Sequence, residues 1–171
     1  GTPYQMGYQH GVLLKEHIKT VYQDYLLGML REKVKDDRKF KAGFNYFKHK
    51  AKILEKFIPL EYKEELHGIA DGSGLSYDDM LIIHTFLDVL SQPRFAKKGM
   101  FKSCTNFVVL NSASADTRLI HGRNLSWPPR GILEKESVVI FYQPQSGNFF
   151  ATMSWPGICG VLTGMNTKGL T

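Results

Sequence analysis

At residues 103–125 the sequence reads SCTNFVVLNSASADTRLIHGRNL. Two short runs rich in Val, Ile, Phe and Thr, residues 105–110 and 118–123, flank a stretch of Ser, Ala, Asn and Asp. Runs of this composition and length, separated by turn-forming residues, are typical of a β-hairpin. Because the preceding residues follow a helical period, this stretch predicts the point at which the chain changes from helix to strand.

The residues before the hairpin are predicted to be helical. Apolar residues recur at helical spacing over 7–30 and 44–57, and a third helix is expected over 60–70. The fourth helix has the clearest start signal, because Ser76 and Asp79 form a capping box in front of the apolar residues 80–90. Pro93 is expected to end it.

Strands are predicted to continue after the hairpin, over residues 137–143, 148–154 and 159–163. Consecutive strands at this spacing favour an antiparallel sheet, so the expected fold class is α+β with a helical first half. Residues 1–103 and 104–171 are expected to be two parts of one domain. Because the strands carry apolar residues on both faces, the sheet needs cover on both sides, and we expect the fold to be incomplete at its carboxyl end.

The composition excludes several classes of protein. Hydrophobic residues make up 43% of the 171 residues and charged residues 22%, which is ordinary for a globular domain. Of the net charge of +6, residues 1–103 contribute +4, and their Lys and Arg are interleaved with Asp and Glu without a recognisable nucleic-acid-binding motif. We therefore expect no nucleic-acid partner. A basic protein that binds a membrane surface remains an alternative, and no His or Cys spacing indicates a metal site.

Cys104 is the candidate nucleophile. If Leu110 lies opposite Arg118, antiparallel pairing places Cys104 opposite Asn124 and one step from Arg123, within a residue or two. A nearby cation favours the thiolate form of a cysteine and stabilises the anion of an acyl-transfer intermediate. The alternative interpretation is that Cys104 is a small buried hydrophobe. Cys104 and Cys159, the two cysteines of the chain, could form one disulfide or leave a reactive thiol, and we expect no bridge if Cys104 is the nucleophile.

The sequence resembles the cysteine N-terminal-nucleophile (Ntn) hydrolases, a group that includes acid ceramidase, choloylglycine hydrolase and isopenicillin N acyltransferase. It is most similar to the bacterial acyltransferase-like members. The segments that carry the resemblance are residues 7–11 (GYQHG), 68–76 (GIADGSGLS), 103–109 with 119–125 (SCTNFVV and LIHGRNL), 155–157 (WPG) and 164–170 (GMNTKGL).

This resemblance implies an αββα sandwich that is made as an inactive precursor. The Ser103–Cys104 bond would be cut by the thiol of Cys104, and the freed α-amino group would act as general base without a cofactor. Arg123 would polarise the site, while Asn124 and Asn166 would contact a small acyl-amide substrate, which could be lipid-like. By analogy with the family, the protein is expected to be secreted, periplasmic or lysosomal.

One residue departs from the family pattern. The usual motif is Gly-Arg-Asn-Leu-Asp-Trp, and Ser126 stands where that Asp belongs. The Asp orients the nucleophile's amino group, so Ser126 in this catalytic position puts autocleavage or turnover in doubt. An inactive relative that uses the fold as a binding module is therefore the alternative to an amidohydrolase or acyltransferase.

Overall fold

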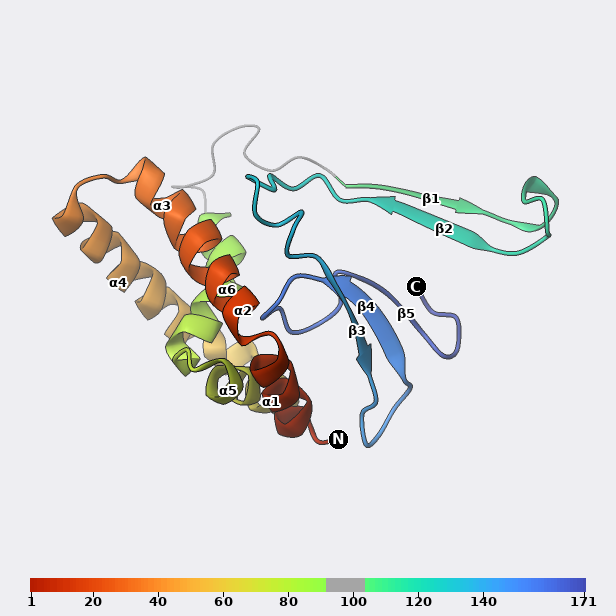
Figure 1. Cartoon of the computed structure of the whole chain (residues 1–171), viewed down its shortest axis with the longest axis horizontal. Helices are drawn as coiled ribbons and strands as arrows, with labels where there is room; N and C mark the ends of the chain where they lie inside the picture. The colour runs from red at the N-terminus through yellow and green to blue at the C-terminus, as the bar shows by residue number, and fades with distance from the viewer. Residues whose placement is uncertain (92–103) are drawn as a thin grey trace.

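The computed structural model describes residues 1–91 and 104–171, and it is an α+β structure in which helices precede strands (Figure 1). The expected helix end at Pro93 and the cleavage residue Ser103 lie outside the described residues. The helical elements are α1 (Pro3–Leu13), α2 (Lys15–Thr20), the π-helix η1 (Val21–Leu27), α3 (Gly28–Lys33), α4 (Asp37–Leu54), the 3-10 helix η2 (Glu55–Phe57), α5 (Leu60–Ser73) and α6 (Tyr77–Leu90).

The first predicted helix is longer than expected and is not a uniform α-helix. It begins at Pro3 because Thr2 caps it, in a capping box with Gln5. At Leu14 the backbone leaves the helical region (φ −113°, ψ 20°), and helix resumes as α2. From Val21 to Leu27 it widens into a π-helix before continuing as α3. Such wide turns occur frequently at functional sites.

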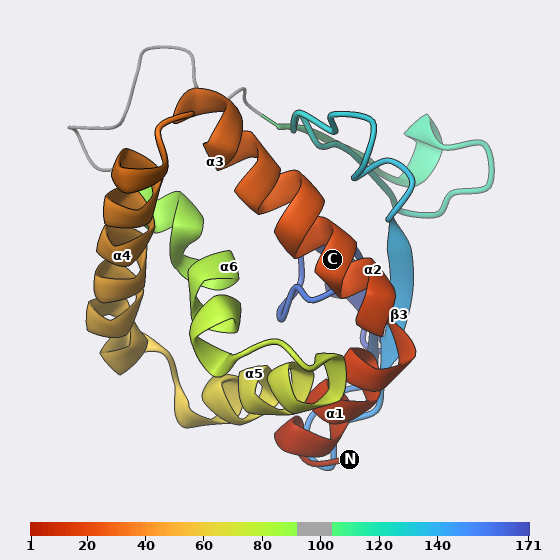
Figure 2. The same cartoon turned by 60° about the vertical axis from the view of Figure 1, so that its left-hand side comes forward.

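Glycines set the close crossing of α1 and α5, which lie against each other in Figure 2. A Cβ atom placed on Gly7 would lie 2.1 Å from the carbonyl oxygen of Glu65, and one on Gly68 would lie 2.2 Å from that of Tyr4. Gly11 and Gly72 meet in the same way one helical turn further along. Two of the segments that carry the family resemblance therefore owe their glycines to helix packing.

Helices α4, α5 and α6 enclose the main core with the first helical stretch. The predicted capping box of Ser76 and Asp79 is confirmed at the start of α6. The hydroxyl of Tyr22 donates a hydrogen bond to Asp79, which ties η1 to this helix start. The core is apolar, and its larger buried residues are Ile18, Tyr22, Leu26, Phe47, Leu66, Ile69, Met80, Leu81, Ile82, Phe86 and Val89.

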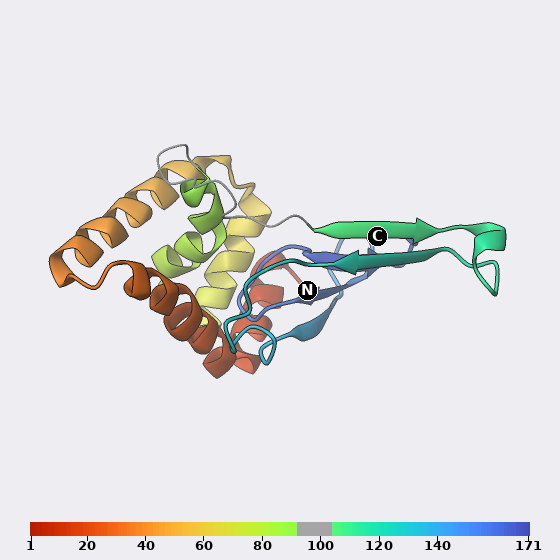
Figure 3. The ribbon, with the colours of Figure 1, turned by 90° about the horizontal axis from the view of Figure 1, so that it is seen from above.

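The strands form two separate antiparallel sets within the described residues, where a single sheet was expected. One set is a ribbon of β1 (Thr105–Val109) and β2 (Ile120–Asn124) that extends away from the helices (Figure 3). The other has the order β3 (Val138–Tyr142), β4 (Phe150–Ser154) and β5 (Thr163–Asn166). The strand predicted over 159–163 starts later than expected, at Thr163, because Gly160 has a positive φ angle (93°) and the residues before Thr163 form a loop.

The three-stranded sheet packs one face on the helices. Tyr142, Thr152 and Ser154 point inward and are buried, whereas Phe141 and Met153 point outward and are exposed. This alternation is the period of two expected of a strand with one covered face. Since the outward side chains are themselves apolar, the expectation of apolar residues on both faces is met, but the described chain covers only one of the two faces.

None of the described helices is long and apolar enough to cross a membrane.

Candidate active site

The hairpin register brings Cys104 and Arg123 onto one face of the ribbon. Thr105 pairs with Asn124 and Asn106 pairs with Arg123, so the register differs by one residue from the one expected. The difference matters, because residues directly opposite each other share a face. In the expected register Arg123 would point away from Cys104. In the observed register Cys104 lies opposite Leu125. Arg123 is two residues before Leu125, so it is the diagonal neighbour of Cys104 on the same face.

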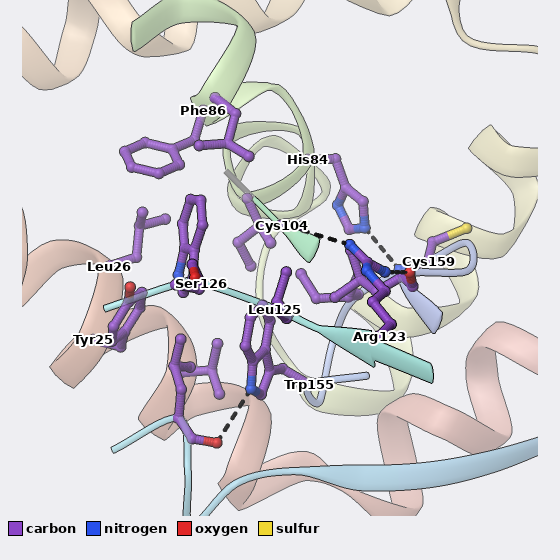
Figure 4. A pocket seen from close by; sticks show the side chains of 17 residues that line it. Tyr25, Leu26, His84, Phe86, Cys104, Arg123, Leu125, Ser126, Trp155 and Cys159 are labelled. Atoms are coloured by element: carbon purple, nitrogen blue, oxygen red, sulfur yellow. Dashed lines mark hydrogen bonds between the residues drawn. The ribbon is translucent and has the colours of Figure 1, made fainter. Parts of the chain in front are cut away.

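The guanidinium of Arg123 bridges the ribbon and the three-stranded sheet. Its Nη1 donates to the carbonyl oxygen of Leu162 and to Oγ1 of Thr163 (2.8 Å), at the start of β5. Its Nη2 lies 3.7 Å from Sγ of Cys104 (Figure 4). Two acceptors on one nitrogen hold the planar group in place and direct the other nitrogen at the sulfur. This arrangement can stabilise negative charge on the thiol or on an oxyanion formed beside it.

Cys104 and Arg123 line a cavity of about 460 Å³ that reaches into the helical layer. Its walls come from η1, α6, the end of the ribbon and the loop between β4 and β5 (Figure 4). Most of the lining is apolar: Val21, Tyr25, Leu26, Ile83, Phe86, Leu87, Leu125, Trp127, Leu133, Trp155, Ile158 and Leu162. The volume and the lining are those of a site for a small apolar ligand with one polar end.

The aromatic walls have their polar atoms occupied. Nε1 of Trp155 donates a hydrogen bond to the carbonyl oxygen of Leu133 (3.1 Å), and the hydroxyl of Tyr25 donates one to the carbonyl oxygen of Pro128 (2.9 Å). Burial also raises the pKa of Tyr25. Because these groups already have partners, the rings contribute apolar surface to the cavity. The other side chains of the lining that carry nitrogen, oxygen or sulfur include Cys104, Arg123 and Ser126.

The structure brings together only some of the predicted site residues. Ser126 lines the same cavity as Cys104 and Arg123. Asn124 is exposed, and its position next to Arg123 in β2 places it on the other face of the ribbon. Asn166 lies at the far end of β5 and uses its Oδ1 to accept from the backbone N–H groups of Lys168 and Leu170. It therefore shapes a turn, and it does not line the cavity.

The second cysteine and a histidine also line the cavity, and the sequence had not assigned either to it. Burial and the neighbouring Glu65 raise the pKa of the Cys159 thiol. This thiol is therefore a poor nucleophile, whereas Cys104 is exposed, and both are free cysteines. His84 accepts a hydrogen bond from the backbone N–H of Cys159. The signal in the sequence that could have indicated a role for His84 in the cavity was its position inside the apolar run of residues 80–90.

Comparison with known proteins agrees with a hydrolase. No family model matches the chain. It is 30% identical over 185 residues to an uncharacterized protein of Archaeoglobus fulgidus, a match that covers 99% of this chain and 30% of that protein. It is also 30% identical over 187 residues to protein dcd1A of Dictyostelium discoideum, covering 96% of this chain and 40% of that one.

A third relative has a named activity. The N-acylethanolamine-hydrolyzing acid amidase of Caenorhabditis elegans is 28% identical over 152 residues, covering 89% of this chain and 39% of that enzyme. The chain thus spans only 30% to 40% of the length of these relatives. Its distant homologues include amide hydrolases, which supports the Ntn hydrolases in the broad sense and a hydrolase at a coarse level.

Proposed function

We propose that this chain carries the nucleophile of an Ntn-type amide hydrolase or acyltransferase, with Cys104 as the attacking group. The observation that carries the proposal is the position of the Cys104 thiol, which lies 3.7 Å from a fixed guanidinium in the lining of a mostly apolar cavity. An acyl-transfer enzyme needs a nucleophile, a positive group for the developing oxyanion, and a surface that holds the acyl chain. These three features meet here.

The active form arises by cleavage of the Ser103–Cys104 peptide bond. The Cys104 thiol attacks the carbonyl carbon of Ser103, the C–N bond breaks, and the nitrogen leaves as the α-amino group of Cys104. Water then hydrolyses the resulting thioester between Ser103 and Cys104, which restores the free thiol of Cys104. In the mature protein that amino group takes the proton of the thiol, so no separate histidine base is needed.

In the catalytic reaction the Cys104 sulfur attacks the carbonyl carbon of the amide. Arg123 stabilises the charge on the oxygen, the amine leaves with a proton from the α-amino group, and a thioester remains. Water, or a second amine in a transferase, attacks the thioester and releases the acyl group. Ser126 stands in the same cavity, where it can accept a hydrogen bond from the amino group without supplying a charge.

The substrate that fits is a small amide with an apolar acyl chain. An acyl chain in the cavity would contact the aromatic walls, and each buried methylene contributes about 0.8 kcal/mol. We also propose that residues 104–171 form the start of one sheet of an αββα sandwich, with residues 1–103 as the preceding segment. The packing of the three-stranded sheet on the helices and the amide hydrolases among the distant relatives support this architecture.

Cleavage and hydrolysis test the proposal together. Intact mass should show two fragments that divide before Cys104, and a fluorogenic fatty-acyl amide of aminomethylcoumarin should be hydrolysed. Cys104→Ala should remain one chain and be inactive, and the matched Cys104→Ser variant should cleave slowly or not at all, because a hydroxyl is a weaker nucleophile than a thiol. Hydrolysis that persists in a folded Cys104→Ala variant would rule out the proposed nucleophile. Cleavage without hydrolysis of any acyl amide would favour a binding module.

A further inference from the structure

One loop links the helical layer to the groups that accept hydrogen bonds from Arg123. This wall loop, residues 155–160, is the first part of the connection between β4 and β5, and it lines the cavity with Trp155, Ile158 and Cys159. One residue, Val161, separates it from Leu162 and Thr163, whose carbonyl and hydroxyl oxygens accept from the guanidinium of Arg123. Any displacement of the wall loop therefore moves the acceptors that hold Arg123 beside Cys104.

Two histidines from different helices hold the wall loop. Nε2 of His10, in α1, accepts from the backbone N–H of Gly157 at 2.9 Å. Nε2 of His84, in α6, accepts from the backbone N–H of Cys159 at 2.8 Å. The two bonds lie two residues apart in the loop, so together they fix both its position and its rotation against the helices.

Both histidines must be neutral to do this. Nδ1 of His84 lies 2.8 Å from the carbonyl oxygen of Met80, which can only accept, so Nδ1 carries the hydrogen and Nε2 keeps its lone pair. His10 is 6% exposed, and burial with the nearby His84 lowers its pKa to about 4. Burial likewise lowers the pKa of His84. Each ring is thus an uncharged acceptor at neutral pH, as a backbone N–H partner requires.

We propose that His84 and His10 are positioning residues for the Cys104–Arg123 pair. They hold the wall loop on the helices, and the loop holds the acceptors that aim the guanidinium at the sulfur. The contacts that position Arg123 are features of the structure itself. The effect of this positioning on catalysis rests on the function proposed above. The histidines themselves contact neither the sulfur nor the guanidinium through any hydrogen bond of the described residues.

Two amide substitutions at position 84 separate the bond to the loop from the bond to the helix. In His84→Gln the side chain reaches about as far as Nε2 and can still accept from the N–H of Cys159. In His84→Asn the side chain reaches only about as far as Nδ1. It can still donate to the carbonyl of Met80 but cannot reach the loop. The two variants share the same functional group, so a difference between them reports the loop bond.

The readouts are hydrogen exchange at the Cys159 amide and the rate at which iodoacetamide alkylates Cys104, followed by peptide mass spectrometry. His84→Asn should speed exchange about tenfold or more and slow Cys104 alkylation severalfold. His84→Gln should stay within about twofold of the parent in both. His49→Gln, at an exposed position of α4, is the control and should change neither.

Faster exchange in His84→Asn with an unchanged alkylation rate would overturn the proposal, and so would equal behaviour of the Asn and Gln variants. If neither variant folds, Thr163→Val decides, because it removes one acceptor of Arg123 and leaves the histidines intact. Alkylation should then slow while the Cys159 amide stays protected, and an unchanged rate overturns the proposal. Neither readout uses an amide substrate, so a failure of the proposed hydrolysis is seen separately.

Discussion

Nη2 of Arg123 lies 3.7 Å from Sγ of Cys104, although the two residues are diagonal neighbours in the hairpin and not directly paired. A diagonal separation in an antiparallel ribbon is within reach of a long side chain. The contact therefore depends on the length of arginine and on the acceptors at Leu162 and Thr163 that keep its guanidinium in place.

Replacing Arg123 should separate the effect of charge from the effect of geometry. Arg123→Ala should lower kcat/KM for an acyl amide by about a hundredfold or more, as removal of an oxyanion donor does. Arg123→Lys keeps the charge but loses the planar group that contacts three partners at once, so it should recover only part of the rate. The measurement is steady-state hydrolysis with urea unfolding as a stability control. Equal rates for the Ala and Lys variants would show that charge at this position does not contribute.

Restoring the carboxylate at position 126 should raise the rate of self-cleavage or of amide turnover. In Ser126→Asp the carboxylate can accept a hydrogen bond from the amino group of Cys104 and orient it, and a well-placed general base is worth on the order of a hundredfold. Ser126→Asn is the matched control, because it has the same shape without the charge. Chain cleavage by mass spectrometry and hydrolysis of a fluorogenic amide are the readouts. If the folded Asp variant changes neither rate, Ser126 does not occupy the position of the missing carboxylate.

Filling the cavity should shorten the acyl chain that the protein accepts. Leu87 lines the cavity from α6 and is 42% exposed, so a larger side chain can enter without displacing a buried one. Leu87→Trp should lower kcat/KM for long acyl chains by about tenfold relative to short ones, since excluding a few methylenes costs about 0.8 kcal/mol each. Leu119→Trp, at an exposed position just before β2, should leave the preference unchanged. An identical chain-length profile in Leu87→Trp would place the acyl chain elsewhere.

His10 should make the protein less stable in acid. Its pKa is about 4 in the folded chain against about 6.5 when unfolded, so the unfolded state binds the proton more tightly. The contribution of His10 to the free energy of unfolding should therefore be largest above about pH 6.5. It should fall by up to roughly 3 kcal/mol as the pH drops to about 4, and His10 should cause no further loss below about pH 4. Urea unfolding across this range measures it. His10→Gln should flatten the slope in this window, and an unchanged slope would assign it to another group.

A matched pair of glycine substitutions tests the crossing of α1 and α5. In Gly68→Ala the new Cβ would lie 2.2 Å from the carbonyl oxygen of Tyr4, so the helices must separate, at a cost of about 1–3 kcal/mol. A Cβ added to Gly43, in α4, would meet no described atom within 4 Å, so Gly43→Ala should stabilise the protein by about 0.5–1 kcal/mol. Thermal or urea unfolding gives both values. Two changes of the same sign would contradict the packing argument.

The sequence by itself determined the order and type of most elements. The capping box at Ser76 and the short runs rich in Val, Ile, Phe and Thr within residues 105–123 and 137–154 are local signals, because caps and strand composition depend on neighbouring residues only. The hairpin pattern placed Cys104 near Arg123, and the resemblance to the Ntn hydrolases implied that Cys104 is the nucleophile. The strand predicted over 159–163 starts only at Thr163 because Gly160 adopts a positive φ angle, and the apolar composition of the segment does not encode that angle.

Only the tertiary structure decided which candidates meet. The one-residue difference in register put Arg123 on the face of Cys104, and register depends on how the ten-residue connection between the strands closes. The division into two sets of strands, the cavity walls from η1 and α6, and the support of the wall loop by His10 and His84 all join residues far apart in the chain. Such contacts depend on the packing of whole elements, and no local pattern of residues encodes them.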